Sequence, residues 1–115
     1  MRYIRTLLFL LLILSCSKYD RRIIVPVFSK SQKIVLKSDN KENITSINIH
    51  ISGHLDGEAK LVLMLNKKPY KTKIISGNID FIWDGDWYSN SASIIYKPID
   101  TAKGEIEITY EFNEI

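Results

Sequence analysis

Cysteine and the short motifs of catalytic proteins are almost absent from this chain of 115 residues. Its one cysteine, Cys16, excludes an internal disulfide, because a disulfide joins two thiols. No serine lies in a Gly-x-Ser-x-Gly turn, and no glycine-rich loop could hold a phosphate group. We therefore expect a protein that is not an enzyme and that needs no cofactor.

Helical periodicity is also lacking once the first 17 residues have passed. Apolar residues instead alternate with polar ones, most clearly over residues 104–112, GEIEITYEF. The apolar residues of that segment should share a buried face: Ile106, Ile108, Tyr110 and Phe112. Its glutamates should face water: Glu105, Glu107 and Glu111.

Shorter segments of the same kind fill the rest of the chain, at residues 23–28, 33–37, 44–51, 58–65, 70–75, 79–83 and 91–96. The turn-forming pairs between them include Asp56-Gly57, Gly77-Asn78 and Asp84-Gly85, and residues 66–69 have the length of a hairpin loop. Pro26 should lie on an edge strand or at a bulge, because it cannot donate to a ladder. The spacing predicts an all-β domain over residues 23–115. We expect a single antiparallel β-sandwich of seven to eight strands, immunoglobulin-like or jelly-roll in type.

The first 17 residues have a different pattern. Two arginines, Arg2 and Arg5, precede an apolar run at residues 7–14, and small polar residues follow it. This is the layout of a secretory signal peptide. The apolar run is much shorter than the roughly 20 residues that a transmembrane helix needs, so we expect cleavage rather than retention.

Residues 13–16, Ile-Leu-Ser-Cys, resemble the lipobox of bacterial lipoproteins. The resemblance implies that residues 1–15 are removed as a signal peptide and that Cys16 then carries a diacylglycerol and a further acyl chain such as palmitate. Residues 16–22 would form the lipidated cysteine and its tether. Several acyl chains would anchor the protein firmly, where a single chain is only marginal.

The same resemblance places the protein in the bacterial cell envelope. Some inner-membrane lipoproteins have an aspartate directly after the cysteine, and Ser17 at that position favours the outer membrane. A second pattern remains open, because Ser15 and Ser17 also form a small-x-small cleavage site. A cut after Ser17 would discard the cysteine.

The formal net charge of +3 includes Arg2 and Arg5 of the signal segment, so the remaining chain is nearly neutral. A nearly neutral domain argues against nucleic acid as a partner. Residues 18–73 carry twelve Lys and Arg against five Asp and Glu, whereas residues 74–115 carry two against eight. Such halves interleave in an antiparallel sheet, so we expect opposite charges to pair across strands rather than to form a basic patch.

Aromatic and acidic residues gather at residues 81–90, FIWDGDWYSN. The candidates for a sugar site are Trp87, Tyr88, Asp84 and Asp86. A pyranose ring stacks on an aromatic face while carboxylates bond to its hydroxyl groups. Trp83 alternates with Ile79 and Phe81 along the expected strand, so it should share their buried face and lie in the core. Calcium is a variant of this hypothesis, but two aspartates supply few of the six to eight oxygens that it binds.

A second candidate site lies where His50, His54 and Asp56 occupy alternate positions. Imidazole nitrogens and a carboxylate are ligands for zinc or copper. Residues two apart on a strand are about 6 to 7 Å apart, and the two histidines are four apart, so they could share an ion only if the chain bent near Gly53. We therefore expect two solvated histidines, with a metal site as the alternative.

These patterns together predict a small exported envelope lipoprotein that acts as a non-enzymatic binding or structural module. Its lipid would hold it at the membrane, and its partner would be another envelope protein or a glycan. The alternative is a periplasmic or surface protein that binds a glycan or a metal ion.

Overall fold

Antiparallel strands make up most of the part of the chain that the structure, a computed structural model, describes: residues 21–27, 30–38 and 41–114. The strands are β1 (Arg21–Val27), β2 (Gln32–Lys37), β3 (Ile44–Leu65), β4 (Lys68–Asp86), β5 (Ser91–Pro98) and β6 (Lys103–Glu114). Residues 1–20, with the expected signal peptide and Cys16, lie outside the described residues. Within the described ranges, no helix has the length and apolarity that a membrane span requires.

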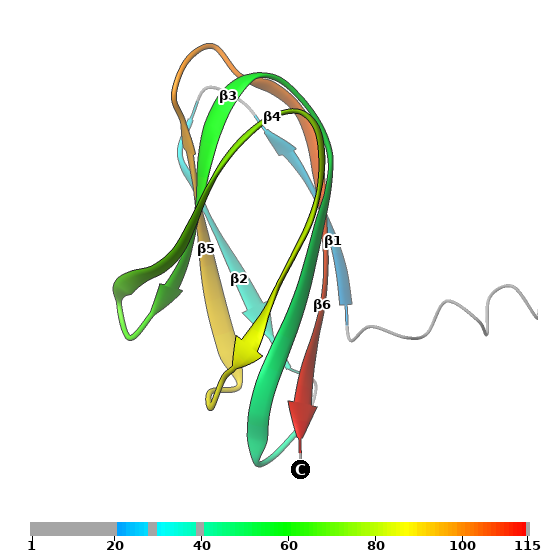
Figure 1. The fold of residues 1–115 in the computed structure, drawn as a ribbon, viewed down its shortest axis with the longest axis vertical. Helices are drawn as coiled ribbons and strands as arrows, with labels where there is room; N and C mark the ends of the chain where they lie inside the picture. Colours follow the sequence, from blue (N-terminus) through cyan, green and yellow to red (C-terminus); the bar gives the residue numbers. More distant parts are fainter. Residues whose placement is uncertain (1–20, 28–29, 39–40, 115) are drawn as a thin grey trace, which may run out of the picture.

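The strand order is β1-β6-β3-β5-β2, and β4 pairs with the other side of β3. The first part of β3 pairs with β6 and its second part with β5, while β4 follows β3 along both parts. Figure 1 shows that β3 and β4 bend together, so that one sheet curls into two limbs. The first limb contains β1, β6, and residues 44–55 and 77–86. The second limb contains β2, β5, and residues 58–65 and 68–76.

The all-β antiparallel class is confirmed, but the residues that the structure describes form six strands, where seven to eight were expected. Asp56-Gly57 and Gly77-Asn78 are bends inside β3 and β4 and not loops between separate strands. Gly57 and Gly77 have φ of +93° and +61°, and the β3–β4 register shifts at the first bend. Such a bulge bends a strand without ending its ladder.

The turns also differ from expectation in their positions. The β3–β4 hairpin closes through two residues, Asn66 and Lys67, whose φ values of 52° and 64° fit the type I′ turn that suits a twisted hairpin. Gly85, expected in a turn, instead pairs with Ile47 inside β4. Pro26 is confirmed on an edge, because β1 pairs with β6 alone among the described strands.

Both limbs contribute to one core. The predicted inner face of β6 is confirmed, since Ile106, Ile108, Tyr110 and Phe112 are all buried. Tyr110 joins the limbs, because its hydroxyl group donates to the Lys37 carbonyl oxygen of β2 at 3.2 Å. The outer face of β6 is less open than predicted: Glu105 is exposed, but Glu107 and Glu111 are half-buried.

Two lysines of β4 bridge the limbs on the side where β4 is the edge strand. The Lys71 ammonium group donates to the Asp84 carbonyl oxygen at 3.0 Å, and that of Lys73 lies 5.4 Å from the Phe81 ring centre. Phe81 in turn packs edge-on against Trp83, which is buried as predicted. The aliphatic parts of long lysine side chains can cover apolar surface while the charges remain in water.

Candidate ligand pocket and charged faces

Trp87 follows β4 and folds back onto β3 and β5. Its backbone N–H donates to the Thr45 carbonyl oxygen at 3.0 Å, and its indole N–H donates to that of Ser91 at 2.9 Å. The residue is 3% exposed, and its ring lies 6.3 Å from that of Tyr70. Trp87 can therefore form the wall of a pocket, but its face is not open for a sugar to stack on.

The four predicted sugar-site residues do not line one sugar-sized pocket. Tyr88 is 76% exposed and borders a separate hollow with Asn43 and Asn90. Asp84, Asp86 and Trp87 border a space of only about 10 Å³, which is about one water molecule in size. Three of the four residues thus meet, but at a space too small for a sugar.

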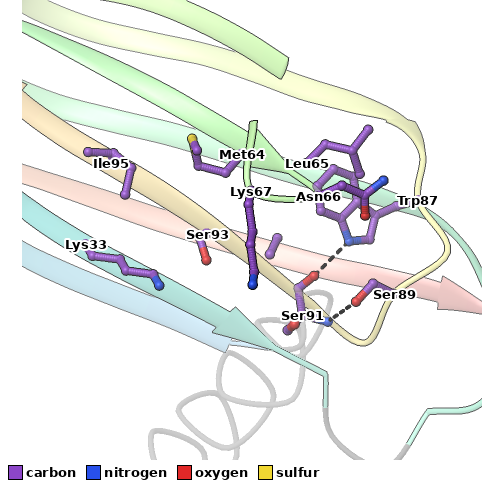
Figure 2. A pocket seen from close by; sticks show the side chains of 11 residues that line it. Lys33, Met64, Leu65, Asn66, Lys67, Trp87, Ser89, Ser91, Ser93 and Ile95 are labelled. Carbon is purple, nitrogen blue, oxygen red and sulfur yellow. Dashed lines mark hydrogen bonds between the residues drawn. The ribbon is translucent and has the colours of Figure 1, made fainter. Parts of the chain in front are cut away.

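A larger pocket lies on the other side of Trp87, with a volume of about 330 Å³ (Figure 2). Its polar lining includes Lys33, Asn66, Lys67, Ser91 and Ser93, and its apolar lining includes Met64, Leu65, Trp87 and Ile95. Figure 2 shows the Lys67 side chain extending from the hairpin turn toward Ser91 and Ser93. The volume falls within the range of small-ligand sites.

Three elements bring these side chains together. The type I′ turn places Lys67 at the tip of the β3–β4 hairpin, and the β2–β5 register places Lys33 opposite Ile95. Ser91 and Ser93 alternate with the buried Ala92 and Ile94, so they face outward. Two ammonium groups beside hydroxyl and amide groups suit a negatively charged, hydroxyl-bearing ligand.

Of the residues that line this pocket, Trp87 is the one that the sequence predicts as a site residue. Lys33 alternates with buried residues in β2, which indicates an outward lysine but not its neighbours. The missing information is the pairing of β2 with β5, two strands far apart in the sequence. Residues 66–69 have the length of a hairpin loop, but nothing in their sequence indicates that Lys67 faces β5.

Charges of one sign gather on each of two outer faces, so the expected cross-strand pairing of opposite charges is found only in part, as where Lys103 lies opposite Asp56. The outer face of the first limb carries carboxylates: Asp80, Asp84, Asp86, Glu105, Glu107 and Glu111. The outer face of the second limb carries lysines: Lys33, Lys37, Lys60 and Lys97. We call these the acidic face and the basic face. Lys60 and Lys97 lie directly opposite each other.

The two histidines lie on the acidic face and bind different partners. The His50 Nε2 is 2.6 Å from a carboxylate oxygen of Asp80. The His54 Nδ1 is 2.9 Å from the amide oxygen of Asn78, and its Nε2 is 3.1 Å from Asp56. Thus His54 and Asp56 meet but His50 does not join them. Across the described residues, no three His, Cys, Asp or Glu side chains are grouped to hold a metal ion.

Hydrogen bonds raise the pKa of His54 above its ordinary value of 6.5. The bond to Asn78 is the larger cause and the bond to Asp56 the next. Both favour the protonated ring, which can donate from both nitrogens.

No protein-family model matches the chain, and no curated protein matches it in sequence. Among solved structures, the crystal structure of PirA is similar, with a TM-score of 0.53 and 13% identity over 84% of this chain and 98% of that one. A de novo designed double-stranded β-helix gives 0.46 and 14% identity, over 79% of this chain and 99% of that one. Latent PorU from Porphyromonas gingivalis gives 0.48 and 6% identity, over 84% of this chain and 13% of that one. The likeness to PirA shows the fold alone.

Proposed function

We propose that the protein is an exported, lipid-anchored binding module that holds an acidic envelope glycan without transforming it. The observation that carries this proposal is the pocket of about 330 Å³ that Lys33 and Lys67 border together. Ammonium groups attract the carboxylates of such a glycan, and the serine and asparagine side chains of the pocket can bond to its hydroxyl groups.

The lining of the pocket favours binding over catalysis. Acid–base or nucleophilic chemistry needs a positioned base such as His, Asp or Glu. The side chains around the pocket are lysine, serine, asparagine and apolar residues. Serine without a nearby base is a weak nucleophile, so a bound glycan would dissociate without being cleaved.

We also propose that the two limbs act as the layers of a β-sandwich of jelly-roll type. Their single core and the Tyr110–Lys37 hydrogen bond support this description. A packed double layer would hold the hairpin tip and β5 in a fixed relation, which a binding pocket requires.

The location is tested by fractionation of a bacterial host. The wild-type chain should partition into detergent and incorporate labelled palmitate, and Cys16→Ala should lose both properties, because no other residue offers a thiol. A soluble wild-type protein that begins at Lys18 would show instead that cleavage follows Ser17 and that the anchor is absent.

The pocket is tested by fluorescence. In Trp83→Phe, Trp87 is the one remaining tryptophan of the two in the chain and reports on the pocket wall. Oligogalacturonate should change its emission, and a neutral oligosaccharide of equal length should not. Lys33→Gln and Lys67→Gln should each weaken binding about three- to fivefold, the size of one exposed ion pair.

Lys68→Gln is the matched control, since Lys68 follows Lys67 but does not border the pocket. It should bind oligogalacturonate like the parent. If the three lysine variants lose affinity equally, attraction is non-specific and the pocket is not the site.

Neutral glycan binding is a second candidate, carried by the exposed Tyr88. Its hollow of about 530 Å³ also contains Asn43 and Asn90, whose amide groups can bond to sugar hydroxyls. Binding of a neutral oligosaccharide that is lost in Tyr88→Ala would support this candidate. A titration in which the neutral oligosaccharide shows no binding would exclude this second candidate for that glycan.

A further inference from the structure

The basic face contains a pair of lysines that form no ion pair with the residues that the structure describes. Lys60 of β3 lies directly opposite Lys97 of β5, an arrangement that brings Cβ atoms to about 5 Å. Like charges at such positions destabilise a sheet. Neither ammonium group contacts a carboxylate of the residues that the structure describes.

The Lys60–Lys97 pair lies next to the pocket, on the same face of β5. Ile95 borders the pocket, and Lys97 follows two residues later on the same face of β5, about 7 Å along the strand. Ile95 is also opposite Lys33 on one side and Val62 on the other. Val62 is only 5% exposed although it faces outward, so an apolar strip lies between the lysines.

We propose that the ligand is a linear acidic glycan of several repeating units, which runs from the pocket across the basic face to Lys60 and Lys97. This inference rests on the proposed function and adds that the ligand is a polymer. One unit occupies the pocket beside Lys33 and Lys67, and carboxylates of later units lie over the like-charge pair. Their negative charge relieves the repulsion that the free protein retains.

The shape of the site favours a chain over a lipid surface. A flat bilayer could meet the lysines of the basic face, but its headgroup plane could not fill a pocket of about 330 Å³ beside Trp87. The acidic face repels the same polymer, so the chain binds on one side of the molecule only.

Affinity for oligogalacturonates of increasing length tests the proposal. A chain of about eight units should bind about tenfold more tightly than one of two units, because only the longer chain reaches two more lysines. Lys97→Glu should remove this gain and leave the affinity for the short chain nearly unchanged. The same change should raise the urea midpoint of unfolding, since it places an opposite charge across from Lys60.

Lys103→Gln is the control, because Lys103 lies in the first limb opposite Asp56 and away from the basic face. It should keep the length dependence. Equal affinity for short and long chains would overturn the polymer proposal while leaving the pocket and the proposed function intact. Tighter binding to phosphatidylglycerol vesicles than to the long chain would assign the basic face to a membrane surface instead, and a lower urea midpoint in Lys97→Glu would refute the like-charge argument.

Discussion

His54 is an exposed side chain with both ring nitrogens engaged. Asn78 offers an amide oxygen to Nδ1, and Asp56 offers a carboxylate oxygen to Nε2. The neutral ring has one N–H and can satisfy one of these acceptors, whereas the protonated ring satisfies both. The folded chain therefore holds the His54 proton more strongly than the unfolded chain does.

An NMR titration of the His54 ring should give a pKa above 6.5, and Asn78→Ala should bring it back toward that value. Asp56→Asn should have the smaller effect. Because the folded-state pKa is the higher one, the stabilisation is complete below about pH 6.5 and disappears as the pH rises through the folded-state pKa. A His54 pKa at or below 6.5 would contradict these two hydrogen bonds.

Residue types in the sequence predicted some members of the candidate site, but not how the side chains of the site are arranged. Trp87 is a predicted ligand-binding residue and lines the pocket, but its indole N–H is bound to Ser91 and its ring is covered. Lys33 and Lys67 could not be foreseen. Their proximity depends on β2 pairing with β5, and nothing in the local sequence encodes that neighbour.

Two glycines allow β3 and β6 to approach closely. A Cβ atom on Gly53 would lie well inside contact distance of the Glu105 carbonyl oxygen. A Cβ atom on Gly104 would lie equally close to the His54 carbonyl oxygen. Both glycines also have positive φ, at +144° and +150°. The strand pair therefore needs residues without a side chain at these points.

Gly53→Ala and Gly85→Ala should separate steric contact from backbone strain. Gly85 has a similar φ of +152°, but a Cβ there would meet nothing within 4 Å. We expect Gly85→Ala to lower the free energy of unfolding by about 1 to 2 kcal/mol, from strain alone. Gly53→Ala should lose about 1 to 3 kcal/mol more, from the clash. Equal losses in urea unfolding would mean that the strands do not approach so closely.

Most strand segments were predictable because the alternation of apolar and polar residues is a local pattern. It was not predictable that two such segments join into one long strand. Asp56-Gly57 has the composition of a hairpin turn, and residues on both sides of it were assigned to separate strands. The ladder continues through the bend because β6 pairs with β3 before it and β5 pairs with β3 after it. Those partners lie about 30 to 70 residues away along the chain, beyond the reach of any local pattern.

The molecule should unfold as one unit, because β3 and β4 run through both limbs and the limbs share a core. Ile108→Ala in the first limb and Leu36→Ala in the second each empty a fully buried site. Each should lower the free energy of unfolding by about 2 to 5 kcal/mol. Tryptophan fluorescence and far-UV circular dichroism should report the same single urea transition for both variants.

Two separate transitions would show that the limbs are independent units. A loss below about 0.5 kcal/mol for Ile108→Ala, the range of ordinary surface changes, would mean that β6 has a different register. Leu36→Ala provides the comparison, since a similar loss at both sites is expected only if one core joins them.

At the scale of the whole molecule, fold class was predictable and charge distribution was not. Alternation of apolar residues in β6 was enough to indicate a sheet with one dry side. The separation into an acidic and a basic face follows from which strands are neighbours. Lys60 meets Lys97 because β5, and not the acidic β6, pairs with the second part of β3.

The position of β6 between β1 and β3 has a consequence for how the protein is made. Of the described strands it is the last to leave the ribosome, yet it pairs with the first strand and with the central one. A nascent chain therefore cannot close this sheet until β6 has been synthesised. The topology itself delays closure of the sheet until nearly all of the described strands have been made.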